Sequence, residues 1–192
     1  MLLFNSTIWL ICLILIIISL LVARLVYRRS VAWLVMAGIF GVYILNVIRY
    51  TFFPFPVDPQ LIQLMRVTGG EAGMWRLNLI PFHSQYYSSI FQDRSNYLNI
   101  LMTVPYGILL PFLFRVNRKW MLICALGIGV TIELFQGVLD LWLGYTYRTV
   151  DINDVIFNFT GAMLGWWLVQ RLGQTTFGKK SLARWLPIMV KK

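Results

Sequence analysis

Apolar residues along the chain gather in five stretches, each about long enough to cross a membrane. A helix rises about 1.5 Å per residue, so about 20 apolar residues span the roughly 30 Å hydrocarbon core of a bilayer. Short polar or basic connections separate the stretches, except for one long connection between the second and the third. We therefore predict an all-α polytopic membrane protein with five transmembrane helices, at about 8–27, 31–53, 97–114, 120–143 and 152–170.

The long connection covers residues 54–96 and mixes polar with apolar residues. Its middle contains the apolar run Asn78-Leu-Ile-Pro-Phe82, followed by His83, the one histidine of the chain. Such a mixture suits a segment that lies in the outer membrane interface or is re-entrant between helices. We interpret His83 as a hydrogen-bonding residue of this interface rather than as an acid or base.

Composition supports this interpretation and limits the number of domains. The chain of 192 residues is 59% hydrophobic and 12% charged, whereas a soluble domain is about half apolar and about a quarter charged. This length accommodates one membrane unit and no second soluble domain. We predict a single transmembrane domain over residues 1–172 and a basic cytoplasmic tail on the membrane surface over residues 173–192. Cys12 and Cys124 lie in apolar stretches without the spacing of a disulfide framework or zinc site.

The charge distribution predicts the orientation. The net charge is +10, but the basic residues occur in short runs beside apolar stretches, which indicates membrane topology rather than nucleic-acid binding. All seven acidic residues fall in the opposite half of the predicted topology. We therefore predict that the N-terminus is outside and the C-terminus is cytoplasmic. The basic residues on the predicted inner side are Arg24, Arg28, Arg29, Arg115, Arg118, Lys119, Arg171, Lys179, Lys180, Arg184, Lys191 and Lys192.

Four of the predicted helices carry polar or small residues along one face, near the predicted outer side. Gly161 and Gly165 form a GxxxG pair, which lets another helix approach closely. Asp151 or Asn153 is expected to cap the start of the last helix. The four sets are Asn46 and Tyr50, with Arg49 nearby; Asn96, Asn99, Thr103 and Gly107; Glu133, Gln136, Gly137 and Asp140; and Asp154, Asn158, Gly161 and Gly165.

Hydrogen bonds between helices explain single members of these sets, each contributing about 0.6 to 2 kcal/mol. Glu133 differs, because an ionisable group at a helix centre costs roughly 3 kcal/mol or more. Its presence beside several carboxylates and two arginines, Arg49 and Arg148, predicts a polar pocket open to the outer leaflet. The predicted ligand-binding residues are Arg49, Asn78, Asn96, Asn99, Glu133, Gln136, Arg148, Asp151, Asp154 and Asn158.

The arginines suggest what this pocket holds. Their planar guanidinium matches a phosphate or carboxylate, so an anionic or isoprenoid lipid head group is the expected ligand. Asp151 and Asp154 are a weak signal for a divalent cation, and helix capping or an ion pair with arginine explains them equally well. We predict no metal site, and the sequence identifies no cofactor.

The ordered set of motifs from about residue 45 to residue 170 resembles the VanZ family, small polytopic bacterial membrane proteins associated with glycopeptide resistance. The resemblance implies a protein of the bacterial cytoplasmic membrane with a role in tolerance of teicoplanin or lipoglycopeptides, but no particular reaction. The matching residues are Arg49; Asn78-Leu-Ile-Pro-Phe82; Asn96 and Asn99 with Pro105 and Gly107; Glu133 and Gln136; and Arg148, Asp151 and Asp154 with Asn158 and Gly161.

Two functions from different classes fit these residues. The first is a binding protein whose pocket holds a lipid head group or the lipid tail of a lipoglycopeptide. The second is an intramembrane enzyme that modifies a lipid-linked envelope precursor, with Glu133 or Asp154 as general base and Arg49 and Arg148 holding a phosphate. Because no catalytic triad, P-loop or zinc spacing is present, we favour binding. Transport ranks third, since no inverted repeat is detectable.

Overall fold

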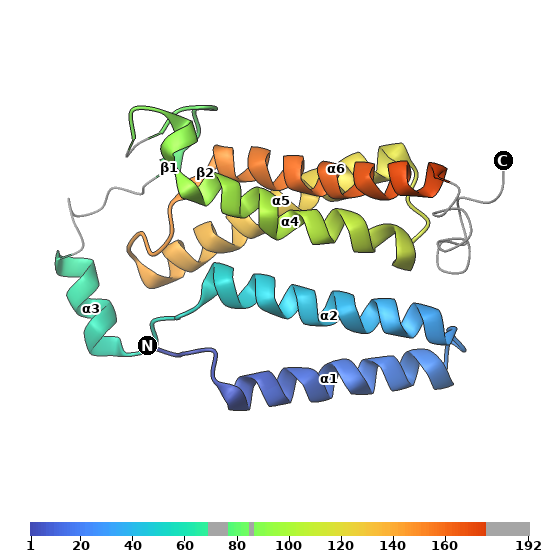
Figure 1. Cartoon of the computed structure of the whole chain (residues 1–192). Helices are drawn as coiled ribbons and strands as arrows, with labels where there is room; N and C mark the ends of the chain where they lie inside the picture. Colours follow the sequence, from blue (N-terminus) through green and yellow to red (C-terminus); the bar gives the residue numbers. More distant parts are fainter. Residues whose placement is uncertain (69–76, 85–86, 176–192) are drawn as a thin grey trace.

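The computed structural model describes residues 1–68, 77–84 and 87–175, and it shows a bundle of long helices (Figure 1). Helices α1 and α2 form a pair, which lies next to a group made of α4, α5 and α6 (Figure 1). The predicted tail lies outside the described residues from residue 176 onward. In chain order the elements are α1 (Ser6–Leu25), α2 (Val31–Phe52), α3 (Pro59–Thr68), β1 (Leu77–Asn78), the 3₁₀ helix η1 (Ile90–Gln92), α4 (Arg94–Leu113), α5 (Arg118–Leu143), β2 (Val150–Asp151) and α6 (Ile152–Gln174).

Each predicted transmembrane stretch is a long helix in the structure. By length and composition, α1, α2, α4 and α5 are able to cross a membrane. Helix α6 has 23 residues but is not in this group, because polar residues such as Asp154 and Asn158 interrupt its apolar sequence. The helical membrane fold is thus confirmed, whereas the count of five membrane-spanning helices stays a prediction.

The long helices begin where a short polar side chain accepts a hydrogen bond from the first turn. Such N-caps satisfy backbone N–H groups that have no partner within the helix. Helix α5 ends at Gly144, whose φ of +73° is the left-handed conformation that favours glycine. The caps of α1, α2, α4, α5 and α6 are Asn5, Ser30, Asp93, Asn117 and Asp151.

Helices α4 and α6 pack with their backbones almost in contact. A Cβ atom added at Gly161 would lie 2.2 Å from the carbonyl oxygen of Ile100, and one at Gly165 would lie 2.0 Å from that of Val104. The hydroxyl of Thr103 donates to the Asn158 carbonyl of α6 at 2.8 Å. This confirms the close approach predicted from the GxxxG pair.

Helix α2 is joined to α4 by side chains that donate to backbone carbonyls. Trp33 Nε1 donates to the carbonyl of Leu113 at 3.1 Å, and the Tyr43 hydroxyl donates to that of Met102 at 2.8 Å. The first contact holds α2 against α4 at the end away from the long connection, and the second holds them together beside the cavity.

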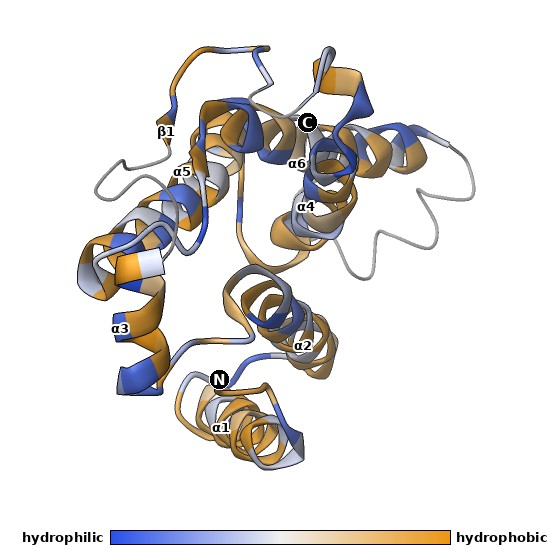
Figure 2. Cartoon of the chain, turned by 90° about the vertical axis from the view of Figure 1, so that its left-hand side faces the viewer, coloured by the Kyte–Doolittle hydropathy of each residue, from blue (hydrophilic) through white to orange (hydrophobic). Residues whose placement is uncertain are grey.

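Helix α1 packs against α2, and none of its residues is buried. Figure 2 shows hydrophobic colour on most sides of both helices. In water this surface would be unfavourable, whereas lipid tails cover it without cost. The exposed apolar surface of α1 and α2 therefore agrees with insertion in a membrane.

A candidate amphiphile-binding cavity

The long connection folds back onto the start of α6. Strands β1 and β2 pair in parallel, with Leu77 opposite Val150 and Asn78 opposite Asp151. Asn78 is buried, and its Nδ2 donates to both carboxylate oxygens of Asp151 at 3.0 Å and to the backbone carbonyl of His83 at 2.8 Å. Residues 77–83 are thereby fixed to a segment more than 70 residues further along the chain.

Asn153 completes this connection from the other side. Its Oδ1 accepts from the N–H of Phe82 at 2.7 Å, and its Nδ2 donates to the carbonyl of His83 at 2.8 Å. The side chain of His83 itself is exposed to the surroundings, so it is the backbone of this residue that is held. Together Asn78 and Asn153 satisfy backbone groups that would otherwise lose their hydrogen bonds on burial.

The segment before α6 runs back along the polar face of α5. Asp140 Oδ1 accepts from the N–H groups of Tyr147 at 2.8 Å and Arg148 at 3.0 Å, and Glu133 Oε2 accepts from the N–H of Asp151 at 2.8 Å. Seven helical residues rise about 10 Å, and three extended residues cover about 10 Å, so the two carboxyl groups match the spacing of these N–H groups. The predicted polar face of α5 therefore positions residues 147–151.

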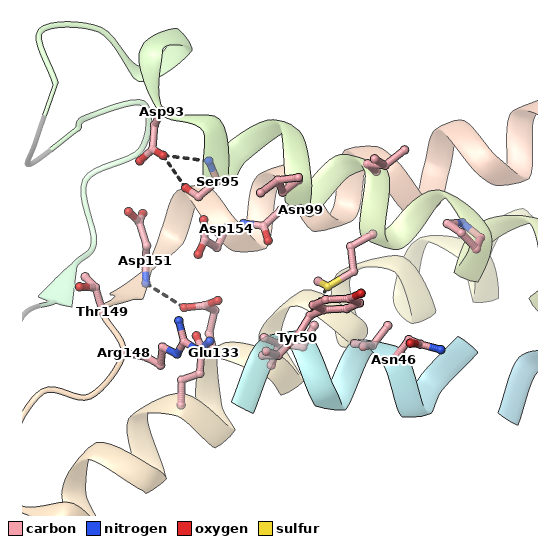
Figure 3. Close-up of a pocket in the computed structure, with 18 of the residues that line it drawn as sticks. Asn46, Tyr50, Asp93, Ser95, Asn99, Glu133, Arg148, Thr149, Asp151 and Asp154 are labelled. Atoms are coloured by element: carbon pink, nitrogen blue, oxygen red, sulfur yellow. Dashed lines mark hydrogen bonds between the residues drawn. The ribbon is translucent and has the colours of Figure 1, made fainter. Parts of the chain in front are cut away.

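Between α2, α4, α5 and this segment lies a cavity of about 820 Å³. Figure 3 shows carboxyl groups from several elements around it, with Tyr50 and Asn46 of α2 opposite Glu133. Apolar side chains share the lining with polar ones. The lining residues are Tyr43, Asn46, Val47, Tyr50 and Thr51 of α2; Ser84 and Asp93; Ser95, Leu98, Asn99, Leu101, Met102 and Pro105 of α4; Ile132, Glu133 and Gln136 of α5; and Arg148, Thr149, Asp151 and Asp154.

The structure brings six of the ten predicted ligand-binding residues to this cavity, namely Asn99, Glu133, Gln136, Arg148, Asp151 and Asp154. Asp154 lies beside Asn99 (Figure 3). These residues come from α4, α5, the segment before α6, and α6 itself. Their convergence agrees with a pocket built from several polar helix faces.

Four predicted residues lie outside the lining. Asn78 holds the docked loop, Asn96 is buried and donates to the carbonyl of Ile90 at 2.8 Å, and Asn158 is fully buried at the contact of α6 with α4. Arg49 is not in the lining, but its guanidinium lies 5.5 Å from the ring of Tyr50, which is. The side chains of Asn78 and Asn96 connect helices and loops, whereas Asn158 accepts from Thr103 through its backbone carbonyl and both polar atoms of its side chain have no described hydrogen-bond partner.

The expected counter-charges of Glu133 are not in place. The structure gives no ion pair between Glu133 and Arg49 or Arg148, all of which it describes. The guanidinium of Arg148 lies 5.2 Å from the ring of Tyr147, and its Nη2 donates to the carbonyl of Phe53 at 3.5 Å. One arginine thus lies at the cavity and is held by an aromatic ring and a carbonyl.

Several polar atoms at the cavity have no hydrogen-bond partner among the described residues. They are Glu133 Oε1, Gln136 Oε1, Asn99 Nδ2 and Arg148 Nε. Glu133 and Gln136 are only 5% and 8% exposed, so the two oxygens are largely shielded from solvent. Buried polar atoms normally form hydrogen bonds, so these atoms are available to a molecule that enters the cavity.

Sequence reasoning missed two features of this site. Asp93, the N-cap of α4, also lines the cavity, and its Asp-x-Ser pattern before an apolar stretch was the available signal. Asn153 was considered only as a cap, whereas its side chain docks the loop. In the described part of the chain, no group of three or more His, Cys, Asp and Glu side chains has the arrangement to hold a metal ion.

The apolar helices and the polar cavity between them define a polytopic helical membrane protein with a candidate site for an amphiphile. The family model for VanZ/LLP1 matches residues 40–173, and the chain belongs to this family. Every residue that lines the cavity lies within the matched region, whereas α1 precedes it. Neither the curated proteins nor the solved structures contain a significant match.

Proposed function

We propose that this protein binds an amphiphile of the bacterial cell envelope in the cavity, and that binding confers tolerance of teicoplanin or related lipoglycopeptides. The observation that carries the proposal is a space of about 820 Å³ whose lining combines ionisable with apolar side chains. Cavities of about 300–1,000 Å³ are typical of sites for drug-sized molecules. The association of the VanZ family with glycopeptide resistance supports the phenotype.

The lining has a polar part and an apolar part, which suit the head group and the hydrocarbon chain of an amphiphile. Glu133, Gln136 and Asp154 present polar groups, whereas Leu98 and Leu101 of α4 are apolar and 61% and 68% exposed. A head group would lie at the former and an acyl chain along the latter. With the N-terminus outside, the cavity belongs to the outer half of a plasma-membrane protein. A lipoglycopeptide tail held there would be removed from its cell-wall target.

The test is the tolerance of a susceptible bacterium that expresses the full chain. We expect Glu133→Gln and Arg148→Ala each to return the inhibitory concentration of teicoplanin to that of the empty vector, with membrane abundance close to normal. Because both residues serve one cavity, the double variant should be no worse than either single variant. Asp58→Asn is the matched control, since Asp58 is an exposed carboxylate outside the lining. Full tolerance with Glu133→Gln would refute the role of the cavity.

One observation favours an intramembrane enzyme as the second candidate. Glu133 Oε1 lies at the cavity without a hydrogen-bond partner among the described residues, so it is positioned to accept a proton from a bound substrate. Such an enzyme would modify a lipid-linked envelope precursor. Incubation of the purified protein with envelope lipids, followed by mass analysis of the products, decides between the candidates: a changed head group indicates an enzyme, and unchanged lipid indicates binding.

A further inference from the structure

The charges at the cavity differ from those expected for an anion site. Its lining contains four carboxyl groups, those of Asp93, Glu133, Asp151 and Asp154, and one basic residue, Arg148. Arg49 lies outside, and Arg148 forms no ion pair with a described carboxylate. Buried charges are costly unless a partner of opposite sign compensates them. The cavity therefore has an excess of acidic groups for which the described residues provide no counter-charge.

Two of these carboxyl groups already have structural partners, and a third, that of Asp154, lies beside the amide of Asn99. Asp151 accepts from Asn78 and from the N–H of Asn153, and Asp93 accepts from the N–H and the hydroxyl of Ser95. Glu133 is different, because Oε2 is occupied by the N–H of Asp151 but Oε1 is buried and has no described partner. Gln136 Oε1, one helical turn further along, is also buried and has no described partner. Both oxygens require a hydrogen-bond donor.

A protonated amine meets these requirements better than a metal ion does. An ammonium group has three donors and no acceptor, so it can satisfy Glu133 Oε1 and Gln136 Oε1 together while neutralising one carboxylate. A metal ion alone fits less well, since the described residues form no cluster of three metal-binding side chains and the cavity is far larger than an ion. The apolar lining adds that the amine belongs to a molecule with a hydrocarbon chain.

We propose that the cavity selects amphiphiles whose head group carries a protonated primary amine, held between Glu133 Oε1, Gln136 Oε1 and the acidic lining. This inference rests on the proposed function, because it specifies the ligand class of the same cavity. It reverses the sign of the head group that two arginines suggested, since the structure places one of them elsewhere.

The test is native mass spectrometry of the full-length protein in detergent, with a metal chelator present. The probes are three lysophospholipids with the same acyl chain: lysophosphatidylethanolamine with a primary ammonium, lysophosphatidylcholine with a quaternary ammonium that has no N–H, and anionic lysophosphatidylglycerol. We expect the ethanolamine lipid to bind at least ten-fold more tightly than the other two. Because the choline lipid keeps the positive charge, its weaker binding isolates the contribution of N–H donation.

Amino-acid substitutions test whether the ethanolamine lipid binds at Glu133. Glu133→Gln keeps an oxygen for the N–H of Asp151 but removes the charge. It should therefore lower the affinity for the ethanolamine lipid at least ten-fold and change the affinity for the other two lipids by less than two-fold. Asp58→Asn should leave all three affinities unchanged. An unchanged thermal unfolding midpoint for Glu133→Gln shows that the variant is folded. Should the variant unfold, the preference among the three lipids in the unmodified protein still decides the question.

The outcomes separate this inference from the function on which it rests. Equal binding of the three lipids, or preference for the glycerol lipid, overturns the selection of an amine while leaving an amphiphile-binding cavity. Binding that appears only when the chelator is left out, and so needs a divalent cation, overturns it as well. If none of the three lipids binds, and teicoplanin does not bind either, both the inference and the proposed function fail.

Discussion

Carboxylate and amide side chains in this protein hold backbone groups far more than they hold opposite charges. Asp140 accepts two backbone N–H groups, Glu133 accepts one, and the side chains of Asn78 and Asn153 bind the loop through five contacts with backbone atoms or with Asp151. In a medium without water, a backbone group has no alternative partner, so each such bond is worth more than at a wet surface. These residues therefore shape the cavity whether or not they touch its ligand.

Asn78 tests this structural role. Asn78→Ala removes the donor to the His83 carbonyl and to Asp151, whose Oδ2 has no other described partner, and such a loss costs about 1 to 3 kcal/mol. We expect a lower thermal unfolding midpoint of the purified protein in detergent. His83→Ala is the matched control, because only the backbone carbonyl of His83 takes part, and it should unfold as the unmodified protein does. Equal destabilisation by both variants would contradict the role of the amide.

At the scale of elements, small residues decide which helices touch. Gly107, Gly161 and Gly165 allow α4 and α6 to approach until backbone meets backbone, whereas α2 and α5 both line the cavity and meet through the rings of Phe52 and Phe135. Without a hydrophobic force between helices in lipid, such close packing is a main source of helix association. The tight pair of α4 and α6 thus forms a rigid wall for the cavity.

Replacement of a glycine in this pair should be strongly destabilising. In Gly161→Ala the new Cβ atom would lie 2.2 Å from the Ile100 carbonyl oxygen, a distance that forces the helices apart. Overpacking of this kind costs about 1 to 3 kcal/mol or more, and we expect a marked fall in the unfolding midpoint in detergent. In Gly127→Ala the new atom meets nothing within 4 Å, so the midpoint should stay within the error of the measurement. Similar midpoints for the two variants would contradict the packing described here.

The positions of the helices could be predicted from the sequence, whereas the contacts between their faces could not. Apolar length alone located the helices, with boundaries that differ by two or three residues where Asn5, Asp93 and Asn117 act as caps. A spacing of three or four residues shows which side chains share a face, but it does not show which neighbour that face meets. For this reason two residues grouped with the cavity by spacing lie elsewhere: the Asn96 side chain binds the carbonyl of Ile90, and Asn158 is fully buried at the contact of α6 with α4.

The pairing of β1 with β2 was beyond sequence analysis for a different reason. Each strand has two residues and no strand pattern, and the partners Asn78 and Asp151 are 73 positions apart. The sequence also could not show that Arg148 lines the cavity and Arg49 does not, because both arginines adjoin polar helix faces. The backbone of residues 144–151, which folds back along α5, decides that Arg148 reaches the cavity.

For the whole molecule, one end of the bundle carries the docked loop and the cavity. The starts of α4 and α6 and the ends of α2 and α5 lie at this end, together with α3 (Figure 1). Arg24, Arg28, Arg115 and Arg118 belong to the connections at the opposite end. The positive-inside rule then predicts that the cavity end faces outward.

Labelling of single cysteines tests this orientation. After replacement of Cys12 and Cys124 by serine, Asp58→Cys and Arg118→Cys each introduce one exposed thiol, at opposite ends of the bundle. A membrane-impermeant maleimide added to intact cells should label the position 58 variant and leave the position 118 variant unlabelled until the cells are opened. The reverse pattern would contradict the predicted orientation and place the cavity on the cytoplasmic side.

The docking of residues 77–83 on the start of α6 also orders events during synthesis. A ribosome adds about 5 to 20 residues per second, so the 73 positions between Asn78 and Asp151 take about 4 to 15 s to produce. Throughout that interval the loop has left the ribosome without the partner that fixes it. The cavity is therefore completed only after the start of α6 has been made and has packed against the loop and α4.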